Sequence, residues 1–256
     1  MSTAAVVSAL ELEPSVRTEG STMRRVVIVQ HEDNAGIGRF AAPLEELGVT
    51  VTTVGPGVGV DVPEALGDVD GLIVLGGSPG PNDDGAAPWL PRVRGLIQEA
   101  LDRELPYLGI CLGGQLLAVV AGGTVEPVRI RPEIGLSEIE TTAAGESDPL
   151  VGELPKQTRS MQWHFEEVTL LPPGSVSLMS SGSCPNQAFR VGSKAWGVQF
   201  HPEADATTAK SWATGDDAEL TRIGMTAEAV TAPFGLADPE LDETWIPLLK
   251  RWVAFL

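Results

Sequence analysis

Short apolar runs alternate with amphipathic segments over the first half of the chain. A run rich in β-branched residues over 26–29 predicts a strand covered on both faces, and further strands are expected over 49–54, 71–75 and 107–110. Helix-spaced apolar residues predict helices over 40–47, where Gly48 supplies a C-terminal stop, and near 92–103. Strands that alternate with helices at this spacing indicate βαβ units. We therefore expect an α/β fold with a doubly wound, mostly parallel sheet and helices on both of its faces.

The pattern becomes strand-rich after Gly122-Gly123. Short alternating or apolar segments between turn residues predict a smaller antiparallel region, at residues 124–141, 167–171, 175–180, 187–191 and 194–200. An apolar stripe over 245–256 predicts a last helix with Pro247 in its first turn. No repeat or low-complexity linker follows residue 22. We expect a single domain over 23–256, preceded by a disordered N-terminal extension over 1–22.

Charge and cysteine content narrow the possible functions. The 35 acidic residues exceed the 17 basic ones by 18, and this negative field predicts that nucleic acid is not a partner. No apolar run approaches the ~20 residues that cross a bilayer, and the first residues do not resemble a secretory signal. Two cysteines and three histidines leave little material for disulfides or a metal centre. We expect a cytoplasmic protein with no metal, no cofactor and no membrane contact.

A candidate nucleophile lies between two glycines in Gly109-Ile110-Cys111-Leu112-Gly113. This spacing is typical of a strand-to-helix turn, in which glycines relieve crowding around a residue held in a strained conformation. Such a turn places Cys111 at the carboxyl end of the sheet, where α/β proteins bind ligands. It also places the sulfur at a helix N-terminus, which favours thiolate, and leaves the N–H of Leu112 free to bind an oxyanion. The alternative is that Cys111 is a small buried apolar residue.

A candidate base and its partner lie in Phe200-His201-Pro202-Glu203. Pro202 keeps His201 extended, and residues two apart in an extended segment face the same side. Glu203 can therefore hydrogen-bond to one imidazole nitrogen and fix its tautomer, which leaves the other nitrogen to exchange a proton with a thiol. The alternative is a surface histidine beside an unrelated acid.

Together, the G-I-C-L-G-G-Q and F-H-P-E motifs resemble those of class I, triad-type glutamine amidotransferases. The resemblance covers nearly the whole chain and is closest to free-standing proteins similar to the amidotransferase domain of GMP synthase. It implies a flavodoxin-like fold in which Cys111 is the nucleophile and His201 and Glu203 complete a catalytic triad. It also implies that the N–H groups of Gly77 and Leu112 form the oxyanion hole.

The same resemblance implies a glutamine pocket. Gln115 falls where the family uses a glutamine to hold substrate, and His164 and Gln187 lie in segments that border the pocket in relatives. The chain departs from the family at Phe165-Glu166, where relatives commonly have Gly-Asp. This departure leaves the triad intact and leaves open whether the substrate is glutamine or another γ-glutamyl compound.

The implied reaction is attack of Cys111 on a γ-glutamyl amide to form a thioester, which water then hydrolyses. An amidotransferase passes the ammonia to a synthetase, which here would be on another chain because this one contains no ATP-binding module. A γ-glutamyl peptide or γ-glutamyl amine hydrolase uses the same triad without a partner. We favour the amidotransferase because of the resemblance. A non-catalytic regulatory module is a third hypothesis, which the complete set of triad residues argues against.

Overall fold

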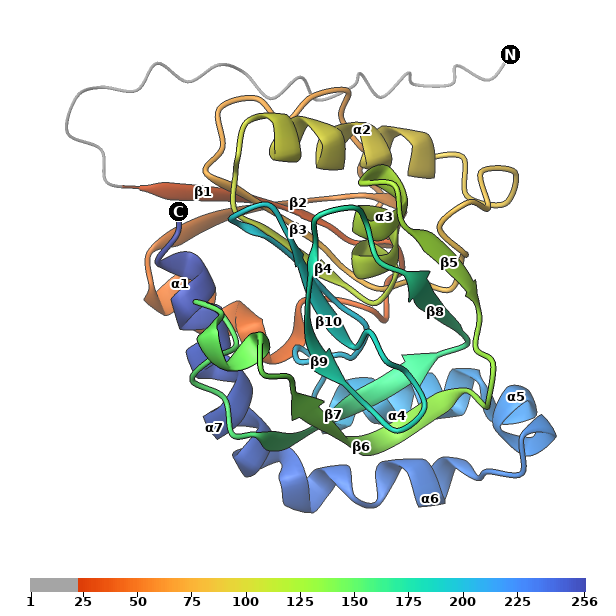
Figure 1. The fold of residues 1–256 in the computed structure, drawn as a ribbon. Coiled ribbons are helices and arrows are strands. Elements are labelled where there is room, and N and C mark those ends of the chain that lie inside the picture. The colour runs from red at the N-terminus through yellow and green to blue at the C-terminus, as the bar shows by residue number, and fades with distance from the viewer. Residues whose placement is uncertain (1–22) are drawn as a thin grey trace, which may run out of the picture.

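A nine-stranded sheet runs through the computed structural model, which describes residues 23–256 (Figure 1). Its strand order is β2-β1-β3-β4-β11-β10-β9-β6-β7. The first five strands are parallel: β2 (Val49–Val54), β1 (Arg24–Val29), β3 (Gly71–Val74), β4 (Tyr107–Ile110) and β11 (Ala195–Val198). The expected extension over 1–22 lies outside the described residues.

Antiparallel strands continue the same sheet beyond β11. They are β10 (Ala188–Val191), β9 (Val176–Ser180), β6 (Glu133–Thr141) and β7 (Gln157–His164), and β5 (Thr124–Pro127) pairs with β8 (Glu166–Leu170) in a separate two-stranded sheet. The sequence did not predict β7. Four of its five buried positions are polar, namely Thr158, Ser160, Gln162 and His164, so the strand lacks the apolar alternation that predicts an inward face.

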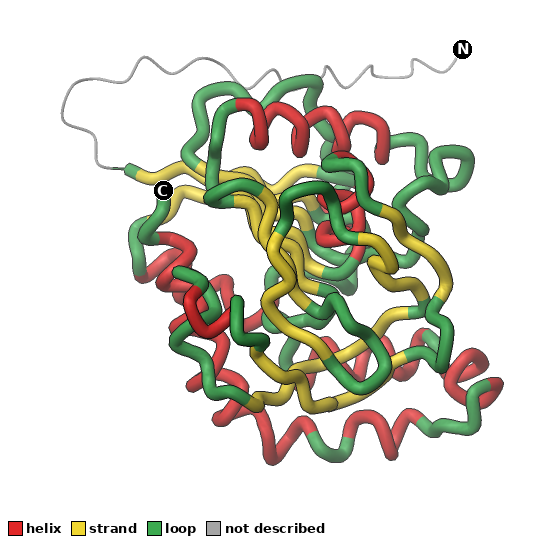
Figure 2. The backbone as a smooth tube through the Cα atoms, viewed as in Figure 1, coloured by secondary structure: helices red, strands yellow, loops and turns green. Residues whose placement is uncertain are grey.

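Helices cover both faces of the parallel strands, as the doubly wound prediction requires (Figures 1 and 2). On one face, α2 (Leu90–Asp102) and α3 (Leu112–Val120) pack in one apolar cluster with Val27, Leu72 and Val74. On the other face, α1 (Ala41–Glu46) and α7 (Phe234–Val253) pack with Val26, Ile28 and Ile73. Successive residues of β1 and β3 alternate between the two clusters, which explains why residues 26–29 and 71–74 are apolar throughout. The doubly wound α/β fold is confirmed.

The C-terminal region is more helical than the sequence indicated. The predicted last helix is wrong in its start: α7 begins at Phe234, and Pro247 lies inside it rather than in its first turn. Phe234 and Leu241 bury against the same cluster as the predicted stripe, so the apolar face extends further back. Three helices that were not predicted precede it, namely α4 (Ala206–Gly215), α5 (Asp217–Arg222) and α6 (Ala227–Thr231). None of the helices in residues 23–256 combines the length and the apolar character that a bilayer span requires.

The pairing of β4 with β11 positions the functional residues. The two strands are parallel neighbours, and Ile110 lies opposite Val198. Cys111 follows the first strand and the segment 199–203 follows the second. Because parallel strands present their carboxyl ends at the same edge of a sheet, the two sequence motifs meet there.

Candidate active site

Cys111 forms the turn between β4 and α3. Its dihedrals, φ 50° and ψ −107°, lie in a region that costs an L-residue about 1–3 kcal/mol. Its N–H donates to the carbonyl oxygen of Val198 at 2.8 Å, which ties the turn to β11. A Cβ on Gly113 would lie 2.0 Å from the carbonyl oxygen of Val74, so α3 can approach β3 this closely only with glycine there. The turn is therefore the strained strand-to-helix connection that the glycine spacing predicts.

His201 follows β11 in an extended segment and lies beside Glu203. The N–H of His201 donates to the carbonyl oxygen of Met161 at 2.8 Å, and its Nδ1 lies 2.8 Å from Glu203 Oε1. Both side chains are 3% exposed. Burial alone lowers the pKa of His201, but the charges of Glu203 and Cys111 and hydrogen bonds to both raise it to about 10. The arrangement therefore favours an imidazolium at neutral pH.

The backbone around Glu203 is fixed by the segment that enters α1. The N–H of Arg39 donates to the carbonyl oxygen of Glu203 at 2.8 Å, and its guanidinium donates to that of Ala204 at 2.6 Å. The Arg39 side chain is 4% exposed and forms an ion pair with Asp238 of α7 at 3.1 Å. Gly38 has φ +51°, and a Cβ there would lie 2.1 Å from the carbonyl oxygen of Glu203. A residue with a side chain at position 38 would therefore displace this acid.

Cys111 and His201 lie together at the floor of one cavity. The two side chains are close enough that Cys111 contributes to the raised pKa of His201. A Cβ built on Gly76 would lie 3.5 Å from Cys111 Cβ and 2.8 Å from His201 Cε1, so the loop after β3 covers both residues closely. The structure thus brings together the three residues of the predicted triad, which lie on two segments far apart in the sequence.

The cavity has a volume of about 470 Å³, within the range of small-molecule sites. The loop over 77–80, the start of α3, the end of β7 and helices α4 and α5 line it. Its lining includes five carboxylates, those of Glu32, Asp83, Glu166, Asp216 and Glu219. Burial and the charge of Asp83 raise the pKa of Glu166. No Lys or Arg from the described part of the chain lines this space, so its wall is strongly anionic.

Two tryptophans fix the wall formed by α4 and α5. The ring of Trp212 meets that of His201 edge to face, with centroids 4.6 Å apart, and its Nε1 donates to the carbonyl oxygen of Asn34 at 2.9 Å. Trp163 Nε1 donates to Asp216 Oδ2 at 2.9 Å. The helices that the sequence did not predict therefore complete the enclosure of the reactive groups.

The two residues predicted to form the oxyanion hole, Gly77 and Leu112, belong to segments that pack closely against each other. Gly77 lines the cavity, and a Cβ there would lie 2.8 Å from His31 Cβ and 3.3 Å from Leu112 Cδ2. Leu112 is the first residue of α3, where backbone N–H groups have no partner within the helix. The loop and the helix start are therefore adjacent, as an oxyanion hole requires.

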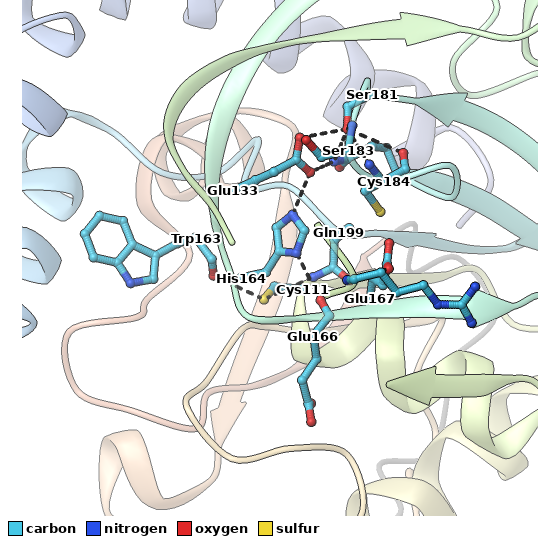
Figure 3. Close-up of polar contacts among 12 residues, drawn as sticks. Cys111, Glu133, Trp163, His164, Glu166, Glu167, Ser181, Ser183, Cys184 and Gln199 are labelled. Carbon is cyan, nitrogen blue, oxygen red and sulfur yellow. Dashed lines mark hydrogen bonds and ion pairs between the residues drawn. The ribbon is translucent and has the colours of Figure 1, made fainter. Parts of the chain in front are cut away.

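The predicted substrate residues separate in the structure. Gln115 and His164 line the cavity, whereas Gln187 does not. Gln187 Nε2 instead donates to Glu133 Oε2 at 2.6 Å, and the same carboxylate oxygen lies 3.1 Å from His164 Nε2. Figure 3 shows His164 between Glu133 and the Glu166 backbone. Gln187 therefore supports the wall from behind.

The other cysteine is placed differently. Cys184 is 1% exposed, and burial raises the pKa of its thiol to about 12. Its N–H donates to Ser181 Oγ at 2.9 Å, in the polar cluster behind His164 (Figure 3). Of the two cysteines, only Cys111 lines the cavity. No group of three or more His, Cys, Asp or Glu side chains suited to a metal ion occurs within residues 23–256.

Comparison with known proteins gives the family. The model of the class-I glutamine amidotransferase family matches residues 39–215, which include all of the triad and most of the cavity wall. The chain belongs to the class-I glutamine amidotransferases. The family match ends at the last residue of α4, and α5, α6 and α7 follow it and pack against the matched part of the chain.

Curated relatives are GMP synthases. The chain is 33% identical over 192 residues to a subunit of the glutamine-hydrolyzing GMP synthase of Natronomonas pharaonis, a match that covers 73% of this chain and 92% of that protein. It is 31% identical over 183 residues to the corresponding subunit of Methanocaldococcus jannaschii, covering 68% of this chain and 87% of the relative. It is 40% identical to the glutamine-hydrolyzing GMP synthase of Porphyromonas gingivalis over 145 residues, which are 56% of this chain and 26% of that enzyme.

Solved structures share the fold over nearly the whole chain. A glutamine amidotransferase from Thermotoga maritima superimposes with a TM-score of 0.81 and 29% identity, covering 90% of this chain and 98% of that one. A glutamine amidotransferase from Methylobacillus flagellatus gives a TM-score of 0.82 and 26% identity, covering 92% and 96%. These matches extend past residue 215, so the C-terminal helices belong to the shared fold.

Proposed function

We propose that this amidotransferase hydrolyses the side-chain amide of glutamine through a γ-glutamyl thioester on Cys111. The observation that carries the proposal is that Cys111 and His201 line one cavity, with His201 Nδ1 2.8 Å from the buried Glu203 carboxylate. The strained turn holds the sulfur at the cavity floor, and the buried carboxylate stabilises the imidazolium. Family membership supports glutamine as the substrate.

The geometry supports a two-step reaction. The Cys111 thiolate attacks the amide carbon, and the N–H groups of Gly77 and Leu112 bind the oxyanion; losing one such donor typically costs ~10²–10³ in rate. Since Nδ1 of His201 faces Glu203, its Nε2 gives a proton to the amide nitrogen as the carbon–nitrogen bond breaks and ammonia leaves. The neutral imidazole then takes a proton from water, which attacks the thioester and releases glutamate and the thiolate.

The ammonia is used, in this proposal, by a synthetase on another chain. Two observations support a separate partner. Two relatives that this chain largely covers are each named as one subunit of a GMP synthase. The match to the longer Porphyromonas gingivalis enzyme covers only 26% of that protein, so this chain corresponds to one part of it. The cytoplasmic location expected from the sequence stays a prediction.

Mass spectrometry with an electrophilic glutamine analogue tests the nucleophile and the substrate class together. We expect one adduct, on Cys111, and protection of that residue by glutamine. Cys111→Ser should lose both the adduct and glutamate release, whereas Cys184→Ser should keep both. An adduct on Cys184, or labelling of Cys111 that glutamine does not slow, would contradict the proposal.

The anionic wall supports a second candidate, a γ-glutamyl amine hydrolase. The cavity is large for one amino acid, and its five carboxylates attract a cationic leaving group and repel an anionic one. The two candidates differ in a direct comparison of γ-glutamyl-1,4-diaminobutane, its neutral γ-glutamyl alkylamide counterpart, and glutamine. A hydrolase should turn over the cationic amide fastest without any partner. An amidotransferase should prefer glutamine and accelerate when its synthetase is added.

A further inference from the structure

A chain of buried amides connects the cavity wall to the reactive sulfur. Gln115 Nε2 lies 3.3 Å from the Glu166 carbonyl oxygen and 3.2 Å from Gln199 Oε1. Gln199 Nε2 in turn lies 3.6 Å from Cys111 Sγ. Gln115 and Gln199 are 4% and 3% exposed, so water does not compete for these contacts. Figure 3 shows the Gln199 amide and the sulfur side by side.

The backbone carbonyl of Glu166 determines which group donates and which accepts in each of these hydrogen bonds. The Glu166 carbonyl can only accept, and it receives hydrogen bonds from Gln115 Nε2 and from His164 Nδ1, the latter at 3.0 Å. The Gln115 amide group must therefore present its nitrogen to both acceptors. Gln199 then accepts through Oε1 and presents its own N–H to Cys111. Because the Glu166 carbonyl can only accept, the Gln199 amide must present a donor, its N–H, to Cys111 Sγ.

The outer end of the chain is itself held firmly. His164 is anchored through Nε2 by Glu133, whose other oxygen accepts from Ser181 Oγ at 2.7 Å. His164 is 2% exposed. The carbonyl that sets the direction of the amides therefore belongs to the first residue of β8, beside the anchored end of β7.

The thiol and thiolate forms of Cys111 use different neighbours. A thiol can donate to the carbonyl oxygen of Trp163, 3.9 Å from the sulfur. A thiolate can only accept, and the Gln199 N–H and the His201 imidazolium are the two donors beside it. The Gln199 contact therefore favours the ionised sulfur over the protonated one.

We propose that Gln199 is a catalytic residue whose side-chain N–H stabilises the Cys111 thiolate, and that Gln115 is the positioning residue that fixes its orientation. The inference rests on the proposed role of Cys111 as nucleophile. In this proposal the thiolate accepts hydrogen bonds from Gln199 as well as from His201. Both contacts stabilise the negative sulfur before it attacks and again when it leaves the thioester.

The rate of Cys111 alkylation by iodoacetamide as a function of pH tests this. Gln199→Met keeps the length of the side chain and removes the donor, so we expect its half-maximal rate about one pH unit above that of the wild type. Gln199→Glu places a carboxylate beside the sulfur and should shift the curve further. At high pH, where every variant is thiolate, the rates should converge. Gln98→Met, the same replacement on the exposed face of α2, should leave the curve unchanged.

Two results would overturn the inference: a Gln199→Met curve that superimposes on the wild type, or one lowered equally at every pH, as expected of a purely structural residue. Gln115→Met provides a second test if Gln199→Met does not fold. It keeps the donor but frees its orientation, so a smaller shift in the same direction is expected and an unshifted curve counts against the inference. Alkylation requires no substrate. A chain that shows these shifts but never hydrolyses glutamine would refute the proposed function and leave this inference intact.

Discussion

The strained turn at Cys111 predicts an unusual ranking of two substitutions. Cys111→Gly should give a more stable protein than Cys111→Ala, although glycine normally destabilises a fold relative to alanine. The reason is the backbone at this position, φ 50° and ψ −107°, which glycine adopts without a steric penalty and alanine does not.

The expected difference follows from two opposing contributions. Relief of the strain stabilises the glycine variant by about 1–3 kcal/mol. The greater freedom of glycine in the unfolded chain costs about 0.5–1 kcal/mol. The net advantage of Cys111→Gly is therefore about 1 kcal/mol, equivalent to a Tm roughly 2–4 °C higher than that of Cys111→Ala.

Equilibrium urea unfolding of the two variants measures this difference. Ala42→Gly is the matched control, because Ala42 lies exposed in α1 and the same exchange there should destabilise the protein. If Cys111→Ala equals or exceeds Cys111→Gly in free energy of unfolding, the backbone at the nucleophile is not strained and the argument for a pre-shaped turn is wrong.

Three further predictions concern buried groups around the site. Glu203→Gln removes the charge that sustains the raised pKa of His201, so the alkaline limb of the pH–rate profile should move to lower pH, and kcat should fall by about 10⁴. Gly38→Ala should lower the free energy of unfolding by about 2 kcal/mol and reduce activity, because its Cβ would meet the Glu203 carbonyl oxygen at 2.1 Å; urea unfolding and glutaminase assays measure both effects. His31 accepts a hydrogen bond from Trp89, and burial lowers its pKa from 6.5 to about 4. The neutral imidazole therefore contributes up to about 3 kcal/mol to the free energy of unfolding above pH 6.5, and this contribution is lost as the pH falls toward 4. His31→Asn should reduce that acid-side loss in urea titrations at pH 7 and 4.5, and equal losses in both proteins would contradict the assignment.

The sequence predicted the fold best where burial acts on both faces of an element. The strand at 107–110 has the predicted bounds and is buried at every position, because a strand covered on both sides leaves a continuous apolar run. The strand at 49–54 also has the predicted bounds, although its central residues are exposed. The pattern failed at β7, whose inward positions include Ser160 and Gln162. It failed again at α7, because its apolar face begins well before the Trp-rich stripe.

The residues of the site also differ in how far the sequence predicts them. Cys111, His201 and Glu203 were predicted because each role depends on close neighbours in the sequence. The contact of Gln115 with Gln199 joins two side chains 84 positions apart and leaves no local signature. Gln187 was predicted to contact substrate but lies behind the wall, a distinction that depends on which way one strand faces.

The register between β4 and β11 has a practical consequence. Each residue of β4 pairs with one residue of β11, so the polypeptide between the two strands begins and ends at the same pair of hydrogen-bonded strands. A break at the exposed residues 129–131 would leave the sulfur on one fragment and the imidazole on the other. Activity of the two fragments after mixing would then show that β4 and β11 had paired again. The protein is therefore a candidate sensor of fragment reassembly.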